Sequence, residues 1–161
     1  MTGRPYREST GVLHDTPEAR DDVIMTITTT DNLAIARRYL EALENGVDGA
    51  ALAEFFTIDV EQEEFPNRLS PIGAHRDLKA LLDSARKGKK TLRAQKYDIQ
   101  HSIVDGDSVA LEVFWSGYLA TPVDTLPADS EMRAHLSIWL EFRDGKICRQ
   151  HNYDCFDPWW V

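Results

Sequence analysis

The sequence predicts an α+β fold, in which helices come first and cover one face of a curved antiparallel sheet formed by the later strands. In the first half of the chain, apolar residues recur at steps of three and four residues, which is typical of amphipathic helices. In the second half, apolar and polar residues alternate over long stretches, and the pairs Asp105-Gly106 and Asp144-Gly145 indicate tight turns between antiparallel strands.

The length and charge of the chain limit its domain count and its partners. A chain of 161 residues fits one domain of ordinary size, which can bury a core without metal or disulfide support. The net charge of -9 and the pI near 5.0 argue against a nucleic acid or an anionic membrane as partner, because either would need a basic surface.

Cysteine usage and hydropathy favour a soluble, cytoplasmic protein. Cys148 and Cys155 fall on one expected strand, on opposite faces and too far apart to form a disulfide with each other. The sequence shows no apolar signal-peptide core near its start and no apolar run of about 18 residues or more. We therefore expect a reducing compartment.

Residues 1–29 are expected to form a disordered arm ahead of a single domain over residues 30–161. The arm contains Pro5, Pro17 and scattered charges, with no sustained helical or strand period. The alternative is that the arm docks on the domain as an extra strand or helix. Met25 is a candidate for an alternative start of translation.

Two helices are expected at the start of the domain. Thr30 or Asp31 can cap the first, and Gly46 can end it. Its apolar positions are Leu33, Ala36, Tyr39, Leu40 and Leu43. Asp48 can cap a short second helix, whose apolar side is Leu52, Phe55 and Phe56.

A strand and a third helix are expected next. The strand runs from Val60 to Phe65 and stops at Pro66, and its run of glutamates is typical of a solvated edge strand. The helix is expected between Gly73 and Gly88. Its apolar stripe is Leu78, Leu81, Leu82 and Ala85.

Four long strands complete the domain. The first two flank Asp105-Gly106, with Tyr97, Ile99, His101 and Ile103 alternating on one and Val109, Leu111, Val113 and Trp115 alternating on the other. The third runs from Met132 to Phe142 and is paired with the last through Asp144-Gly145. Asp154 then lies on or just past the last strand.

The C-terminal segment carries a pattern that resembles a known family. Asp-Gly-Lys-Ile at residues 144–147 is followed by polar residues, then by Tyr153-Asp154 and by Phe-Asp-Pro at residues 156–158. This pattern resembles the SnoaL-like polyketide cyclases and ketosteroid isomerase-like proteins of the nuclear transport factor two-like superfamily. The resemblance implies a sheet curled around the helices as a cone, with a pocket between its concave face and the helical layer.

Asp154 is the candidate catalytic acid/base. Alternation along the last strand groups four side chains on one face: Cys148, Gln150, Asn152 and Asp154. The resemblance favours this face as inward, where Gln150 and Asn152 would bind the ligand and apolar walls would raise the pKa of Asp154 toward neutrality. The alternative is that Asp154 caps the strand or pairs with Arg133 or Arg149 as an ordinary ion pair.

His135 is the candidate partner of Asp154 on the adjacent strand. It shares a face with Ser137 and Trp139, so it can polarise a carbonyl or exchange a proton with Asp154 if that face is inward. The opposite parity would instead put Leu136 and its apolar neighbours inside and leave His135 outside.

Three aromatic residues complete the candidate ligand site. Tyr39 lies on the core stripe of the first helix, where its hydroxyl can donate a hydrogen bond to a ligand carbonyl. Trp115 and Trp139 can line a pocket for a flat ring. The alternative for all three is ordinary core packing.

Other site chemistries have little support in the sequence. The histidines lack the paired spacing of a metal site, and neither a phosphate-binding glycine loop nor a Gly-x-Ser-x-Gly elbow occurs. We therefore expect neither metal nor cofactor. The related limonene epoxide hydrolases activate water with two acids bridged by an arginine, and the neutral Asn152 beside Asp154 departs from that arrangement.

Three functional hypotheses follow from these features. The first is a cofactor-free isomerase, cyclase or hydratase-like enzyme in which Asp154 moves a proton next to a carbonyl of a small apolar or ring-containing molecule. The second is a binding module with the same pocket and no turnover. The third is a homodimerisation scaffold, which Trp139, Trp159 and Trp160 suggest as interface aromatics.

Overall fold

A computed structural model describes residues 32–159, and the expected arm and Met25 lie outside this range. One helix over residues 32–44 precedes the other elements. These are α2 (Gly49–Ala53), β1 (Phe56–Glu64), β2 (Ala74–Arg76), α3 (Leu78–Thr91), β3 (Leu92–Asp105), β4 (Ser108–Leu119), β5 (Glu131–Arg143) and β6 (Lys146–Phe156).

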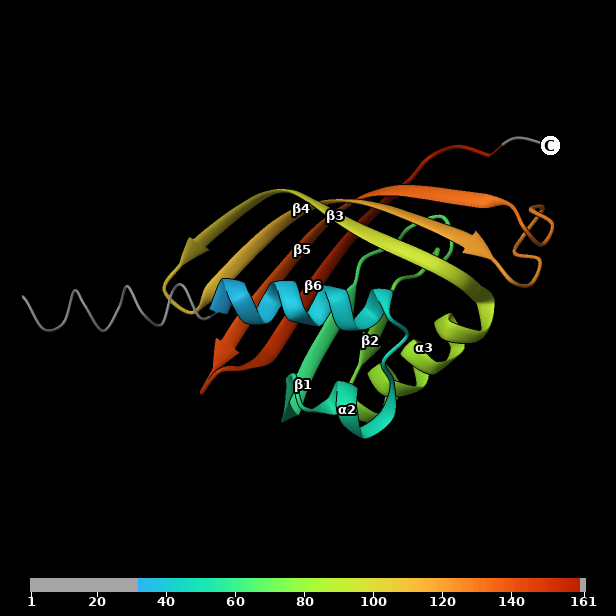
Figure 1. The fold of residues 1–161 in the computed structure, drawn as a ribbon. Helices are drawn as coiled ribbons and strands as arrows, with labels where there is room; N and C mark the ends of the chain where they lie inside the picture. Colours follow the sequence, from blue (N-terminus) through green and yellow to red (C-terminus); the bar gives the residue numbers. More distant parts are fainter. Residues whose placement is uncertain (1–31, 160–161) are drawn as a thin grey trace, which may run out of the picture.

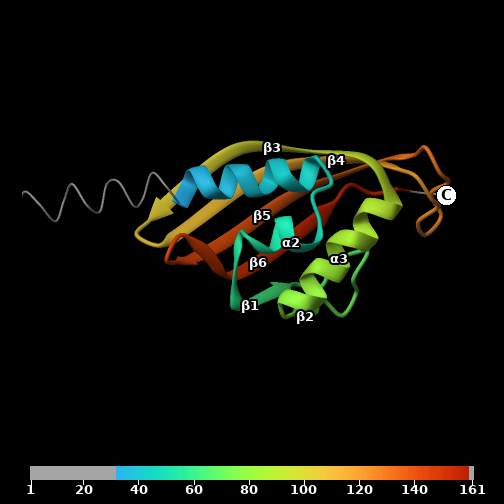
Figure 2. The same cartoon turned by 60° about the horizontal axis from the view of Figure 1, so that its bottom comes forward.

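The strands form one six-stranded sheet in the order β2-β1-β6-β5-β4-β3. Its pairs are antiparallel except for β1 and β6, which run parallel. The helix over residues 32–44 lies along the concave face, and α3 covers the region beyond the C-terminal end of that helix (Figure 1). A second view shows the sheet curling around these helices without closing (Figure 2). The predicted α+β cone is confirmed.

The helix over residues 32–44 forms where the apolar period predicts it. Ala36, Tyr39 and Leu40 are buried, because they face the sheet. At its C-terminal end, the amide of Val47 donates to the carbonyl of Ala42 at 2.9 Å. Gly46 has a φ of +66°, which a glycine adopts without steric cost, so it ends the helix as predicted.

The region between β1 and α3 differs from the prediction. Gly73 has a φ of +70° and forms a turn before the short strand β2, so α3 begins later, with Asp77 as its N-cap. The Asp77 carboxylate accepts a hydrogen bond from the amide of Ala80 at 2.8 Å. At the other end, α3 continues past Gly88 and passes directly into β3.

The acidic strand β1 is not at the edge of the sheet, so that prediction is wrong. β1 begins at Phe56 and pairs with β2 on one side and β6 on the other. Alternation gives its glutamates different environments, because Glu61 is exposed whereas Glu64 shares its face with Gln62 and the buried Val60.

Two bulges change which side chains face inward. On β3 the register shifts between Ile99 and His101, so His101 and Ile103 are exposed although the sequence placed them with Ile99. On β6 the register shifts near Cys148, so Ile147 is buried together with Gln150. Simple alternation had put these two residues on opposite faces, and it fails because a bulge inserts one residue.

The hydrophobic core fills one end of the cone. Near the turns at residues 106–107 and 144–145, Val109 pairs with Leu140, and both are buried beside Ile147. At the other end of the same strands, inward side chains such as Trp115 and Leu136 border a cavity. The fold therefore divides its concave face into a packed half and a hollow half.

Gly117 provides a test of packing beside that cavity. A Cβ atom at this position would lie 2.6 Å and 2.7 Å from atoms of the Trp115 ring. We expect Gly117→Ala to lower the free energy of unfolding by about 1–3 kcal/mol, because the ring has to shift within a packed layer. Chemical denaturation measures this change.

The matched control is Gly88→Ala in α3. No atom lies within 4 Å of a Cβ at that position, and alanine favours a helix over glycine by roughly 0.5–1 kcal/mol. Gly88→Ala should therefore stabilise the protein. Equal unfolding curves for the two variants would contradict the steric argument.

Candidate functional site

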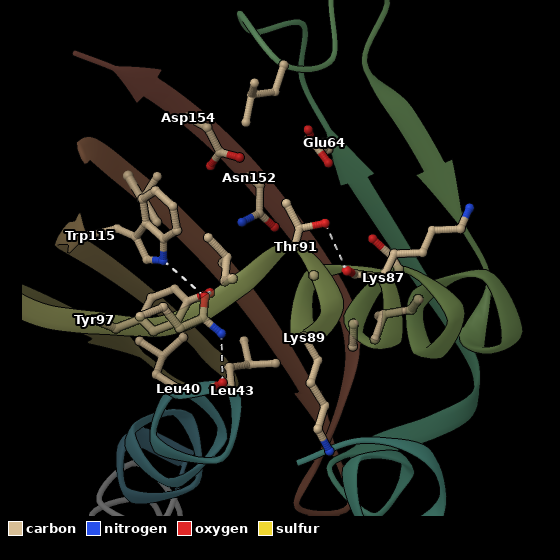
Figure 3. A pocket seen from close by; sticks show the side chains of 18 of the residues that line it. Leu40, Leu43, Glu64, Lys87, Lys89, Thr91, Tyr97, Trp115, Asn152 and Asp154 are labelled. Atoms are coloured by element: carbon tan, nitrogen blue, oxygen red, sulfur yellow. Dashed lines mark hydrogen bonds between the residues drawn. The ribbon is translucent and has the colours of Figure 1, made fainter. Parts of the chain in front are cut away.

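A cavity of about 500 Å³ lies between the concave face of the sheet, the helix over residues 32–44 and α3. Figure 3 shows Asp154, Asn152 and Trp115 pointing into it from the sheet, with Leu40 and Leu43 coming from the helix. Its size suits a small organic molecule, because ligand pockets are concave and combine apolar walls with a few polar groups.

Asp154 is a half-buried carboxylate with one buried, unsatisfied oxygen. It lies opposite Leu136 of β5, and no hydrogen-bond donor reaches its Oδ1 atom, which is inaccessible to solvent. Desolvation is the main cause that raises the pKa of Asp154 to about 6, and the negative charge of Glu64 acts in the same direction. The Asn152 amide and the Arg76 guanidinium partly oppose this increase.

The alternative ion pairs of Asp154 do not form. Arg133 lies near Glu131 and Asp157, whereas Arg149 binds the carboxylate of Glu141. Both arginines are on the outer surface, away from the cavity. Asp154 is therefore not held as half of an ordinary ion pair with either of them.

The other polar residues of β6 belong to a hydrogen-bonded chain. Tyr39 donates its hydroxyl hydrogen to Gln150 Oε1 at 3.1 Å, and Gln150 Nε2 donates to Asn152 Oδ1 at 2.7 Å. Gln62 Nε2 donates to the same Asn152 oxygen at 3.3 Å. Because Asn152 Oδ1 accepts two hydrogen bonds, its Nδ2 group is left to donate elsewhere.

Arg76 ends this chain and was not predicted as a site residue. Its Nη1 donates to Gln62 Oε1 at 3.2 Å, and its Nη2 lies 2.8 Å from Glu64 Oε2. Both members of the ion pair are largely buried, with 18% of each side chain exposed. Glu64 belongs to the acidic run of β1, which the sequence analysis interprets as a solvated edge strand, so Glu64 was not predicted as a site residue. Arg76 lies on β2, a strand that the sequence analysis does not predict.

A second polar group lies near the C-terminal end of the helix over residues 32–44. Tyr97 and Trp115 both donate to Gln95 Oε1, at 3.3 Å and 3.2 Å, and Gln95 Nε2 donates to the carbonyl of Leu43 at 2.7 Å. Burial raises the pKa of Tyr39 to about 12 and raises that of Tyr97 as well, so both hydroxyls are neutral at pH 7. Gln95 and Tyr97 were not predicted as site residues.

His135 and Trp139 do not lie in the cavity, so their predicted inward placement is wrong. Burial alternates along β5, and Leu136, Ile138 and Leu140 take the inward positions. Trp139 is 53% exposed, and its indole nitrogen donates to the Ser137 hydroxyl at 3.0 Å. The structure thus groups Tyr39, Trp115, Gln150, Asn152 and Asp154 at one cavity and leaves His135 and Trp139 on the opposite face.

Three segments meet near the mouth of the cavity. The Arg68 guanidinium stacks on the Trp159 ring, 4.0 Å from its centroid, and donates to the Trp159 carbonyl at 3.0 Å. The Trp159 indole donates to Asp124 at 3.0 Å. The neighbouring Leu69 and Val123 line the cavity, so these contacts connect its rim to the C-terminal segment.

Residues 32–159 contain neither a candidate metal cluster nor a helix suited to a membrane. Within that range no group of three or more His, Cys, Asp or Glu side chains is arranged to hold a metal ion. None of the helices described there has the length and apolar character needed to cross a membrane.

Comparison with known proteins gives one family match and several similar structures. The model of the SnoaL-like domain family matches residues 36–150. Among curated proteins, none matches the sequence.

Solved structures share the fold at low sequence identity. IdmH of Streptomyces antibioticus, a candidate polyketide cyclase, is 20% identical with a TM-score of 0.63, and the match covers 78% of this chain and 91% of that one. An LEH-like epoxide hydrolase of M. tuberculosis is 16% identical with a TM-score of 0.63, covering 78% and 84%. A protein of Catenulispora acidiphila DSM 44928 with a ketosteroid isomerase-like fold is 17% identical with a TM-score of 0.59, covering 74% and 83%.

The raised pKa of Asp154 makes stability depend on pH. Burial raises the pKa of Asp154 to about 6 in the folded protein, whereas an unperturbed aspartate has a pKa near 3.8, so ionisation of this carboxyl increasingly destabilises the fold as pH rises through that window. We expect Asp154→Asn to stabilise the protein by about 3 kcal/mol at pH 7.5 and by little at pH 4. Denaturant unfolding at both pH values measures this.

The control is Asp105→Asn, which removes one negative charge at the exposed end of β3, outside the cavity. NMR titration of the Asp154 carboxyl carbon should give a midpoint near pH 6. A midpoint near the ordinary value of about 4 would contradict the desolvation argument.

Proposed function

Since the chain belongs to the SnoaL-like domain family, we propose that it binds a small ring-containing molecule in this cavity and that Asp154 transfers a proton next to a carbonyl of that molecule. The observation that carries the proposal is the Asp154 carboxyl, which lines the cavity and is desolvated by the side chains around it. A carboxylate with a pKa of about 6 is ionised at pH 7 and is still basic enough to accept a proton.

Asn152 is the proposed donor to the developing oxyanion. Its Nδ2 hydrogens are free of the polar chain, and it lies two positions before Asp154 on the same face of β6. A ligand carbonyl beside Asn152 would place its α-carbon near Asp154. Asp154 would take the α-proton, the electron pair of the C–H bond would move to the carbonyl oxygen, and Asn152 would stabilise the resulting enolate.

The reaction can end in two ways. In an isomerisation, the Asp154 carboxyl returns its proton to a different carbon of the extended enolate. In a cyclisation, the enolate carbon attacks a second carbonyl of the same molecule, and the proton on Asp154 goes to the new alkoxide. Neither route needs a cofactor, because the same proton is removed and returned.

Water activation is the less favoured enzymatic alternative. It would need an arginine that contacts both acids, and Arg76 does lie close to Glu64. No ion pair joins Arg76 to Asp154 in the described part of the chain, and the second donor of Arg76 binds Gln62. The binding module without turnover uses the same cavity, and the exchange experiment below separates it from the enzyme.

The exchange experiment uses 1-tetralone as a bicyclic ketone probe in deuterated water, followed by proton NMR. We expect protein-dependent exchange of the α-hydrogens, with a rate that rises as Asp154 ionises and levels off above about pH 6 to 7. Asp154→Asn should lower the rate by about 10²-fold or more.

The control is His135→Asn on the outer face, which should leave the exchange rate unchanged. Full exchange activity in Asp154→Asn would rule out Asp154 as the base. Tight binding of 1-tetralone without exchange would favour the binding module.

We also propose that the protein is a homodimer that pairs through the outer face of the sheet. Trp139 and Tyr153 are 53% and 43% exposed, and they lie on the neighbouring strands β5 and β6. Trp159 packs against Arg68 and is not part of that surface, and Trp160 lies outside the described residues. The free thiols of Cys148 and Cys155 support the proposal of a reducing, cytoplasmic location.

Light scattering after size exclusion tests the dimer. The wild-type protein should show twice the chain mass of 18.3 kDa, and Trp139→Glu should show a monomer, because a buried charge without a partner disfavours the interface. Ile72→Glu, at a residue that is 94% exposed on a loop, should remain dimeric. A monomeric wild-type protein would contradict the proposal.

A further inference from the structure

We propose that Arg76 is a positioning residue that fixes the direction of the hydrogen bonds around the cavity, so that Tyr39 and Tyr97 accept hydrogen bonds from the ligand and Asn152 donates one. This assignment deepens the proposed function, on which it rests, by naming the ligand chemistry at each end of the cavity. It also reverses the donor role that the sequence suggested for Tyr39.

The direction begins at Arg76 because a guanidinium has only donors. Its Nη1 lies 3.2 Å from Gln62, so the atom of Gln62 at that contact has to be the acceptor Oε1. Gln62 Nε2 is then directed toward Asn152, 3.3 Å away, where the partner has to be Oδ1. Reversing either amide would bring two donors together.

The same reasoning continues to Tyr39. Gln150 lies 2.7 Å from Asn152 Oδ1, which accepts, so Gln150 presents its Nε2 there. Its Oε1 is left for the Tyr39 hydroxyl, 3.1 Å away, and that hydroxyl has to donate. Gln150 and Tyr39 are only 3% and 2% exposed, so bulk water does not compete for the hydrogen bond between them. Arg76 on β2, which can only donate, thereby determines the orientation of the Tyr39 hydroxyl on the helix over residues 32–44.

The Tyr97 hydroxyl also donates to the protein, and the direction of its hydrogen bond is fixed independently of Arg76. The backbone carbonyl of Leu43 can only accept, so Gln95 has to present Nε2 to it, at 2.7 Å. Gln95 Oε1 then accepts from the Trp115 indole, which can only donate, and from the Tyr97 hydroxyl. Both tyrosines thus use their hydroxyl hydrogen on the protein and keep an oxygen lone pair for the cavity that they line.

The polar groups that line the cavity differ in hydrogen-bonding character. Asn152 offers N–H groups beside Asp154, and its nitrogen points toward the Trp115 side of the cavity (Figure 3). The tyrosines offer acceptors. The matching ligand is a ring compound with a carbonyl at the Asn152 and Asp154 side and a hydroxyl donor at the tyrosine side. An acceptor-only group beside Tyr39 would leave both oxygens without a hydrogen.

Neutron diffraction from a perdeuterated, ligand-free crystal tests the direction without any ligand. We expect the Tyr39 deuteron on the line to Gln150 Oε1 and two deuterons on the Asn152 atom that faces the cavity. A Tyr39 deuteron directed into the cavity, or Gln150 Nε2 beside the Tyr39 oxygen, would overturn the proposal.

Calorimetric titration with 2-naphthol and 2-methoxynaphthalene tests the consequence for binding. The two probes share a ring system, but only 2-naphthol can donate a hydrogen bond. We expect the wild-type protein to bind 2-naphthol about tenfold more tightly, and Tyr39→Phe to reduce this ratio. Equal binding, or tighter binding of the ether, by the wild-type protein would overturn the proposal.

A pair of Arg76 variants separates direction from general structural support. Arg76→Lys keeps a donor-only group and should keep the tenfold ratio, whereas Arg76→Gln also offers an acceptor and should bring the ratio toward one, because the amide chain can then reverse. If the ratio of the two affinities is unchanged in Arg76→Gln, the proposed positioning role of Arg76 is wrong. If Arg76→Gln does not fold, or if neither probe binds, the neutron result decides.

The failure of this inference differs from failure of the proposed function. If 2-naphthol and 2-methoxynaphthalene bind equally but 1-tetralone exchange is intact, only the proposed hydrogen-bond direction is contradicted. If 1-tetralone does not exchange but 2-naphthol still binds about tenfold more tightly, the role of Asp154 is contradicted and the hydrogen-bond direction is supported.

Discussion

The site depends on a row of polar side chains on an otherwise apolar concave surface. Gln150, Asn152 and Asp154 occupy successive inward positions of β6, where the neighbouring strand contributes Leu136 and Ile138. Burying polar groups there costs free energy unless they find partners, so the surrounding elements have to supply them. Gln62 and Arg76 reach in from β1 and β2 for this reason, and Tyr39 reaches in from the helix over residues 32–44.

The network leaves one carboxylate oxygen of that row buried without a partner. Gln150 and Asn152 are held by hydrogen bonds, whereas Asp154 keeps an oxygen that is both buried and unpaired. An unsatisfied carboxylate destabilises the fold, and such groups concentrate where a protein binds or transforms a ligand. The ordered amides beside Asp154 fix the cavity around it, so a ligand in the cavity meets a preorganised polar wall that includes the Asp154 carboxyl.

Local patterns predicted most elements, and the errors trace to long-range constraints. The period of the first helix, the glycine at position 46 and the Asp144-Gly145 turn needed only nearby residues, and the structure confirms them. Residues 61–64 were interpreted as an edge strand because their pairing with β6 joins segments about 90 residues apart, which no local pattern records. The short strand β2 and Arg76 were missed for the same reason. The bulges near Ile99 and Cys148 also escaped detection, because one inserted residue leaves no composition signal.

By itself, the sequence predicted the fold class from its periodicity and turns, and the family resemblance favoured the face of the last strand that carries Asp154, Asn152 and Gln150 as the inward one. Only the tertiary structure decided that His135 and Trp139 face outward, since an apolar strand that is bulky on both faces does not show its parity. It also decided that Arg76 and Glu64 reach the cavity and that Tyr39 donates to Gln150. These outcomes depend on which atoms meet across distant strands, and a donor finds its acceptor only when the folded chain brings them within about 3 Å.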